Sequence, residues 1–271
     1  MNVMNMKMLA VLTAMSCLMG MNTSVEAKDK TPVAVTPSVV AAQGMQTAKQ
    51  AKQSKQTAVG SSVKKPADDS LPVYNPKKDA APSEGIPIVE TNFKFTEPLL
   101  VRPKTDTIVV HHVGIPDGDT SAAAIHRAHL HNGWAGIGYQ YVIRKDGTIE
   151  RGRPLATVGA HSYGQNYHTV GICVTGNFEK ETPTKAQVAS LENLLTSLCT
   201  IYKLQPGATT IVGHRDENDT DCPGRNLYKM LPEIRDDVHV KLFEEKLKGT
   251  HLLKLKKYEQ QDQSQSRHNN A

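Results

Sequence analysis

The amino-acid sequence predicts an α/β domain in which helices flank a single mixed central β-sheet. Apolar runs rich in β-branched residues, which are typical of buried strands, occur at Thr107–Val113, Val170–Val174 and Thr209–Val212. Segments between these runs repeat apolar residues every three or four positions, which is the period of a helix with one buried face. Strands that alternate with helices favour one sheet, here in a domain at residues 91–236.

The clearest hairpin signal lies between the first two of these runs. Alternating residues on both sides of Asp146-Gly147 predict two antiparallel strands within Tyr139–Glu150. Because side chains alternate along a strand, Tyr139 is expected to begin the first strand of the hairpin on the same face as Tyr141 and Ile143.

Three helices are expected to cover the sheet. The first, Ser121–Asn132, precedes a glycine, and the third, Leu227–Ile234, follows a Pro-Gly pair. The second opens with Thr184 and Gln187 at the spacing of a capping box. Its buried face is expected to carry Val188, Leu191, Leu195, Leu198 and Tyr202.

Residues 1–27 have the features of a secretory signal peptide. Lys7 precedes the apolar run Met8–Met21, which is too short to span a bilayer. Val25–Ala27 is an acceptable cleavage site for removal of a signal peptide. A lipoprotein anchor at Cys17 is the alternative, although the preceding residues, Ala14–Ser16, fit the sequence expected before a lipid-anchored cysteine poorly. The protein is therefore expected to be exported to the periplasm, the cell envelope or the extracellular space.

Residues 28–90 are expected to form a disordered spacer, because Ala, Lys, Gln and Pro dominate there and aromatic residues are almost absent. From Ser83 the chain is expected to continue to Arg102 as an extended lead-in to the domain. At the other end, residues 237–271 are expected to form a charged helical extension that breaks near Gly249 and ends in a disordered tail.

The positive charge of the chain belongs to the spacer. Residues 28–82 contain nine lysines and four aspartates, a net charge of +5, which equals the net charge of the whole chain. Residues 1–27 carry one lysine and one glutamate, so residues 83–271 are neutral overall. Phosphate binding needs a clustered positive face, so nucleic acid is not expected as a partner. No transmembrane segment is expected in the mature chain, which is expected to be a monomer.

Three cysteines remain after the signal peptide, and an odd number in an exported protein leaves at least one thiol to explain. Metal coordination by Cys222 would explain one of them. Cys173 and Cys199 lie on a predicted strand and a predicted helix, where they are expected to pack as small hydrophobic residues rather than to form a disulfide.

Histidine and cysteine gather at the expected carboxyl ends of two strands. His111 and His112 end the first strand, His214 follows the last strand, and Cys222 lies on the loop that leaves it. A single histidine at a strand end is more often a core or surface residue than a ligand. Two imidazoles and one thiolate together predict a zinc site with three protein ligands and an open fourth position.

Four blocks carry these residues in order. They are Val109–His112, the segment from His129 through Gly133-Trp134 to Gly138-Tyr139 with its hairpin, Val158–His161, and Gly213–Arg215 through Asp221–Gly224. With these blocks the chain resembles the zinc-dependent N-acetylmuramoyl-L-alanine amidases, the family shared by bacteriophage lysozyme-type amidases and peptidoglycan recognition proteins. The resemblance spans about Thr107 to Arg235 and implies their fold.

The resemblance also implies the members of the site. Zn²⁺ is expected on His111, His214 and Cys222, with His111 rather than His112 as the ligand. Peptidoglycan is the expected partner, and the residues expected to contact it are His112, His129, Trp134 and His161.

Tyr139 and Thr220 fall on catalytic positions of the family. Some members carry a lysine where this chain has Thr220, so a lysine-assisted mechanism is not expected here, whereas recognition-protein amidases share the threonine.

The function that the resemblance implies is hydrolysis of the amide bond between N-acetylmuramic acid and L-alanine by zinc-activated water. A non-catalytic peptidoglycan-binding module on the same fold and a zinc peptidase acting within the stem peptide are the alternatives. Binding-only members usually lack the cysteine, so Cys222 favours the enzyme.

Overall fold

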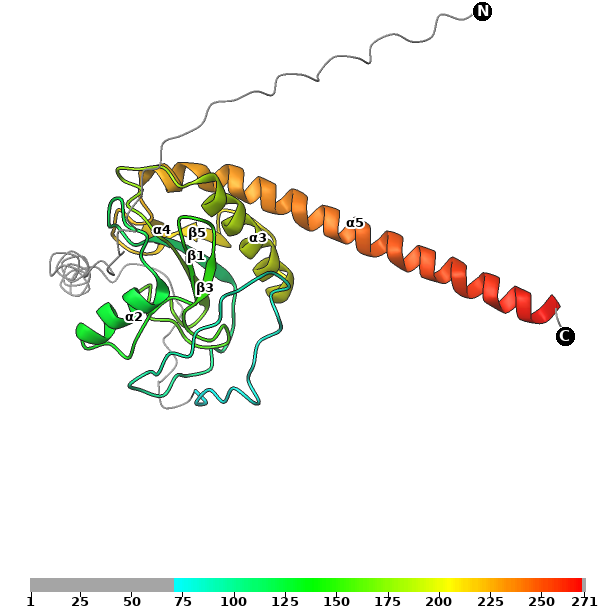
Figure 1. Ribbon diagram of the computed structural model, residues 1–271, viewed down its shortest axis with the longest axis horizontal. Helices are drawn as coiled ribbons and strands as arrows, with labels where there is room; N and C mark the ends of the chain where they lie inside the picture. The colour runs from blue at the N-terminus through cyan, green and yellow to red at the C-terminus, as the bar shows by residue number, and fades with distance from the viewer. Residues whose placement is uncertain (1–70, 270–271) are drawn as a thin grey trace, which may run out of the picture. The chain divides into compact units, whose positions relative to one another are not determined.

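One mixed five-stranded sheet organises the protein. A computed structural model describes residues 71–269, so the predicted signal peptide and most of the predicted spacer lie outside the described residues. The strand order is β3-β2-β4-β1-β5. Figure 1 shows the sheet, with β1, β3 and β5 labelled, and the helices around it. The strands are β1 (Thr107–His112), β2 (Tyr141–Ile143), β3 (Ile149–Arg151), β4 (Thr169–Val174) and β5 (Ile211–Gly213). The predicted fold class is confirmed.

The strands that end at the predicted site run in the same direction. β1 lies between β4 and β5 and is parallel to both, with Val110 opposite Ile172 on one side and Gly213 on the other. β2 is parallel to β4, and β3 pairs with β2 as the antiparallel half of the predicted hairpin. The carboxyl ends of β1, β4 and β5 therefore meet at one edge of the sheet.

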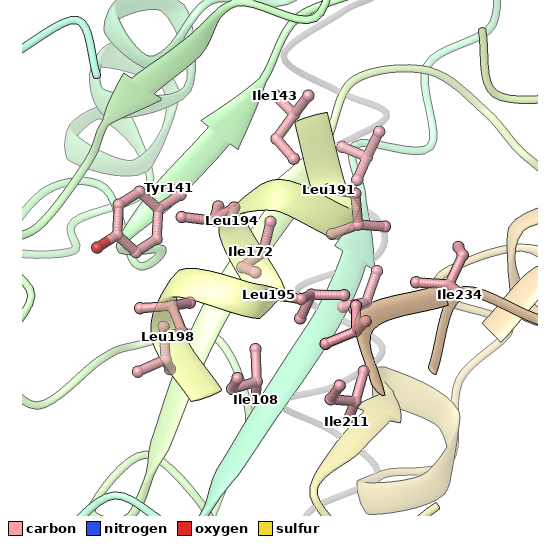
Figure 2. Packing of buried hydrophobic residues seen from close by; sticks show 14 of the residues in the cluster. Ile108, Tyr141, Ile143, Ile172, Leu191, Leu194, Leu195, Leu198, Ile211 and Ile234 are labelled. Atoms are coloured by element: carbon pink, nitrogen blue, oxygen red, sulfur yellow. The ribbon is translucent and has the colours of Figure 1, made fainter. Parts of the chain in front are cut away.

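Helices cover both faces of the sheet. They are α2 (Ala122–His131), α3 (Lys185–Tyr202), the single turn α4 (His214–Glu217) and α5 (Arg225–Asn269). α3 and the first turns of α5 share the larger apolar cluster with alternate residues of the strands, and α2 packs on the opposite face in a smaller cluster. Figure 2 shows leucines of α3 directed at Ile108 and Ile172 of the sheet.

The predicted capping box begins α3. The Thr184 hydroxyl accepts a hydrogen bond from the Gln187 backbone N–H, and the Gln187 side chain accepts one from the Thr184 N–H, both at 3.0 Å. The expected apolar face packs against the sheet, and Cys199 of α3 and Cys173 of β4 are buried free thiols, as expected.

The prediction of a disordered spacer as far as residue 90 is wrong for residues 71–90, whereas the extended lead-in expected from Ser83 to Arg102 lies against the domain without a helix or a named strand. Ile86 and Ile88 pack against the larger apolar cluster, and the Glu84 carboxylate forms an ion pair with Arg151 at 2.8 Å. The N–H of Val89 donates to Ile149 of β3, so this segment covers the outer edge of the sheet. Its composition concealed this, because only a few scattered side chains make the contacts.

The predicted break near Gly249 and the disordered tail are also wrong, because α5 continues to Asn269 through both Pro232 and Gly249. One glycine in a helix costs about 1 kcal/mol, and the Lys, Leu, Glu and Gln around it are good helix formers. Extending an existing helix also avoids the cost of nucleation. Among the described residues, no helix combines the length and apolar content that crossing a membrane requires.

The face of α3 that packs on the sheet should dominate stability. Leu195 of α3 is fully buried, so Leu195→Ala is expected to lower the free energy of unfolding by about 2–5 kcal/mol. Leu247 of α5 is 53% exposed, and Leu247→Ala, the matched control, should change it by less than about 0.5 kcal/mol. Urea unfolding measures both changes, and equal losses in the two variants would contradict this account of the core.

Candidate metal centre

Two imidazoles and one thiol converge at the edge where the parallel strands end. His111 is the penultimate residue of β1, His214 begins α4 directly after β5, and Cys222 lies on the loop between α4 and α5. One side-chain atom from each of the three residues lies within 4.8 Å of the others. The Sγ atom of Cys222 lies 3.7 Å from Nδ1 of His111 and accepts a hydrogen bond from the His112 N–H at 3.3 Å. Among the described residues, this group is the one able to hold a metal ion.

Strand alternation separates His111 from His112. Successive side chains of β1 point to opposite faces of the sheet, so His112 faces the side that α3 covers. Its Nδ1 atom accepts a hydrogen bond from the Phe178 N–H at 3.1 Å, and its ring lies 6.1 Å from that of Phe178. His112 therefore contributes its backbone N–H to the centre, while its imidazole lies outside it.

The Nε2 atom of each imidazole in the centre lies within hydrogen-bonding distance of another side chain. Nε2 of His111 lies 3.0 Å from Nδ1 of His161, and Nε2 of His214 lies 3.0 Å from the side-chain oxygen of Asn218. His161 is predicted to contact the substrate, but in the structure it is buried against His111. The nitrogens that remain for a metal are Nδ1 of His111 and Nδ1 of His214.

Burial controls the protonation of the centre. It lowers the pKa of His111 and of His161 well below the usual value for histidine. Nearby imidazoles lower the pKa of His111 further, and His214, Arg102 and Arg153 do so for His161. Burial also lowers the pKa of His214 to about 4. The imidazoles are therefore neutral at pH 7, as ligands must be. Burial has the opposite effect on the thiol and raises the pKa of Cys222 to about 12, so it holds its proton when no metal is bound.

Tyr139 lies at the centre, although the predicted strand position is wrong. β2 begins at Tyr141, after a bend at Gln140. The successive N–H groups of Gly152 and Arg153 donate to the successive carbonyls of Gln140 and Tyr139, which a regular ladder does not allow. The bend turns Tyr139 toward the face of His111, away from the face of Tyr141.

The Tyr139 hydroxyl is held in its protonated form. Its ring lies 5.1 Å from that of His111. Burial raises the pKa of Tyr139 well above its usual value, and the sulfurs of Cys173 and Cys222 raise it further. At neutral pH this hydroxyl is a hydrogen-bond donor, and the Cys173 sulfur lies within hydrogen-bonding reach of it.

A row of rings leads from the end of α2 to the centre. Trp134 lies 4.5 Å from His129, and His129 lies 5.9 Å from Tyr139, measured between ring centres. His129 is buried and its Nδ1 accepts a hydrogen bond from the Gly138 N–H, whereas Trp134 is partly exposed. Trp134 and Tyr139 are thus the partly exposed members of this row, and His129 is buried between them.

Thr220 lies on the loop that carries Cys222. Its hydroxyl accepts a hydrogen bond from the Cys222 backbone N–H at 3.2 Å, so the threonine helps to shape the turn around the thiol. The structure thus places Thr220 next to the centre on the same loop as the ligand.

Known proteins with this architecture identify the family. The profile of the N-acetylmuramoyl-L-alanine amidase family matches residues 102–225. The chain is 31% identical over 132 residues to the endolysin of Escherichia phage T7, an alignment that covers 46% of this chain and 85% of the endolysin. The chain belongs to the N-acetylmuramoyl-L-alanine amidase family.

Other relatives of this amidase-family chain include an animal protein and a solved structure. Peptidoglycan-recognition protein SC2 of Drosophila melanogaster is 33% identical over 130 residues, which are 45% of this chain and 70% of that protein. The structure of N-acetylmuramoyl-L-alanine amidase LysC from Clostridium intestinale matches with a TM-score of 0.52 and 37% identity. That match covers 56% of this chain and 97% of LysC.

Two residues of the amidase-family centre escaped prediction. Asn218 follows His214 by four positions, the spacing at which side chains meet on a helical turn, and this spacing could have indicated the pair. Cys173 was expected only as a packed residue. Strand register brings it opposite His111 on the neighbouring strand β4, and no local pattern predicts register between strands so distant in sequence.

The metal-free amidase-family domain should lose stability as the pH falls from about 6.5 toward 4. The pKa of His112 and of His129 is about 4 in the folded chain, against about 6.5 for histidine in an unfolded chain. In this window the unfolded state binds protons that the folded state does not, so the free energy of unfolding decreases. Above about pH 7 these two residues add no pH dependence.

Urea midpoints of chelator-treated protein at about pH 7.5, 6 and 5 measure this effect. His129→Gln keeps an oxygen that can accept the Gly138 N–H and should weaken the dependence. A midpoint that stays constant across the three pH values would contradict the assignment of neutral, buried imidazoles.

Proposed function

We propose that this chain is an exported peptidoglycan hydrolase that cleaves the amide bond between N-acetylmuramic acid and the L-alanine of the stem peptide. The observation that carries the proposal is the convergence of His111, His214 and Cys222 within 4.8 Å on an amidase-family fold. Relatives of two kinds, a phage endolysin and a peptidoglycan-recognition protein, support peptidoglycan as the substrate class.

The donor set fits Zn²⁺. Bonds of about 2.0 Å to nitrogen and 2.3 Å to sulfur at a tetrahedral angle separate the two donor atoms by about 3.5 Å. The corresponding separation between Nδ1 of His111 and Sγ of Cys222 is 3.7 Å. Two neutral imidazoles and one thiolate leave one tetrahedral position for water or substrate, as in catalytic zinc sites.

The side chains around the three ligands would complete the chemistry. When bound, zinc supplies the Lewis acidity that makes water nucleophilic at neutral pH and polarises an amide carbonyl. The protonated Tyr139 hydroxyl can donate a hydrogen bond to the carbonyl oxygen, where negative charge develops during attack. The partly exposed Trp134 offers an apolar face with a polar edge to the sugar or the stem peptide. Thr220 holds the loop of the thiol ligand.

Digestion of intact sacculi distinguishes this function from its alternatives. The purified protein is incubated with sacculi, with and without a chelator, and the products are weighed by mass spectrometry. The proposal predicts free stem peptides that begin with L-alanine and that disappear with the chelator. Shortened stem peptides would indicate a zinc peptidase, and intact sacculi with bound protein would indicate a binding module; either result contradicts the proposal.

Replacing the sulfur ligand tests the centre itself. Cys222→Ser is expected to lower hydrolysis by at least about 1,000-fold and to lose bound zinc, because a neutral hydroxyl is a much poorer zinc ligand than a thiolate. Cys199→Ser is the matched control, since Cys199 is a buried free cysteine of α3 outside the centre, and it should keep zinc and activity. Full activity of Cys222→Ser would exclude the proposed ligand set.

The Cys222 thiol should release one proton when zinc binds. At about pH 8 the imidazoles of the metal-free centre are neutral and the Cys222 thiol, with a pKa of about 12, holds its proton, so the thiol is the group that ionises on binding. Calorimetric titration of zinc into the metal-free protein in buffers of different ionisation enthalpy counts these protons. Cys222→Ala should release about one proton fewer than the wild type, and equal counts in the two proteins would show that the thiol does not bind the metal.

A further inference from the structure

The loop at residues 159–169 contacts His111 directly and His214 through Asn218. It carries His161, whose Nδ1 lies 3.0 Å from Nε2 of His111. It also carries Ser162, whose hydroxyl donates to the Asn218 side-chain oxygen at 2.8 Å, the same oxygen that faces Nε2 of His214. One loop thus provides the partner of Nε2 of His111 and contacts the partner of Nε2 of His214, although the two imidazoles come from different strands.

The hydrogen bonds around His161 allow a donor and an acceptor to be assigned to its two ring nitrogens. The Thr169 hydroxyl donates to the Gln165 carbonyl at 2.9 Å, so its oxygen is free to accept from Nε2 of His161, which lies 3.4 Å away. A neutral His161 with its proton on Nε2 has a lone pair on Nδ1. That lone pair accepts the Nε2 proton of His111 and leaves the Nδ1 lone pair of His111 directed toward the Cys222 sulfur.

The contacts of Asn218 fix the tautomer of His214 in the same way. The Asn218 amide nitrogen donates to the Tyr163 carbonyl at 3.2 Å, which identifies the opposite atom of the amide as oxygen. That oxygen accepts from Ser162 and therefore accepts the Nε2 proton of His214 as well. Both imidazoles are left with a proton on Nε2 and a lone pair on Nδ1.

The backbone around His161 is shaped for its ring. A Cβ atom added at Gly171 would lie 2.5 Å from the His161 ring, and one added at Gly159 would lie equally close. Neither position has a positive φ that would require glycine for the backbone conformation. The two glycines leave room for an imidazole in contact with His111.

We propose that His161 and Asn218 are positioning residues that set the tautomers of His111 and His214 and aim the Nδ1 atoms of both at the metal. The proposal rests on the metal centre of the proposed function and assigns His161 a role in place of the substrate contact expected from the sequence. The ordered polar contacts of loop 159–169 are what allow two buried imidazoles to meet a cation without first rotating or exchanging protons.

Imidazole nitrogen spectra and zinc affinity test the proposal in the full-length protein. The metal-free, ¹⁵N-histidine-labelled wild type should show His111 and His214 as single tautomers protonated on Nε2. His161→Ala should give a tautomer mixture at His111 alone, and Asn218→Leu a mixture at His214 alone. Each change should weaken zinc binding about 10- to 100-fold in a chelator competition.

Two further sets of variants separate positioning from folding. His161→Gln and Asn218→Asp keep a side-chain oxygen as acceptor and should recover most of the affinity. His168 is a buried histidine of the same loop that contacts Asp106 and Gln165 instead, so His168→Ala should leave zinc affinity within about threefold. Gly159→Ala keeps every ligand and His161 but should weaken zinc binding because it displaces the His161 ring.

Unchanged tautomers and unchanged zinc affinity in His161→Ala and Asn218→Leu would overturn the proposal. An equal loss in His168→Ala would also overturn it, because general stability of the loop would then explain the effect. Neither measurement uses peptidoglycan. A chain with the expected tautomers and zinc affinity that leaves sacculi uncut would therefore refute the proposed hydrolase and leave the positioning roles standing.

Discussion

The parallel pairing of β1 with β4 and β5 is the constraint on which the rest of the protein depends. It brings the ends of three strands to one edge, so that residues 111, 173 and 214 become neighbours although they are distant in the chain. The side-chain period of a strand is two, so a shift of β1 by one residue would exchange His111 with His112. The apolar residues that α3 and α5 cover prevent that shift, because it would expose them. The core thus specifies which histidine faces the cysteine.

Local patterns predicted the elements whose causes are local. The capping box of α3, the Asp146-Gly147 hairpin and the β-branched strands each depend on residues close in sequence. The capping box and the turn lie where they were expected, and the strand ends lie within two residues of the expected ones. The convergence of His111, His214 and Cys222 was predictable from the strand ends, the loop cysteine and the resemblance to the amidase family. The orientation of Tyr139 was not, since it follows from a bend at Gln140 that strand alternation does not anticipate. The contacts of His161 depend on a loop that no periodic pattern describes.

The two ends of the domain show the limits of composition as a guide. Residues 71–90 have the composition of a spacer, yet Glu84 reaches the buried Arg151 and Val89 extends the sheet at β3. Their order depends on what the rest of the domain offers them, which composition does not record. α5 shows the opposite case. Its glycine and its polar tail lower helix propensity only slightly, and a helix already started at Arg225 continues through them.

Burial prepares the centre for a divalent cation by acting differently on its two kinds of ligand. It keeps the imidazoles of His111 and His214 neutral, so no proton competes with a metal for their nitrogens at pH 7. It also keeps the thiol of Cys222 protonated, so an empty centre carries no net charge inside the protein. Burying an isolated thiolate would be costly, but a dication that displaces the thiol proton compensates the charge it creates. The same burial would therefore favour a neutral centre without metal and an ionised thiolate in the presence of a dication.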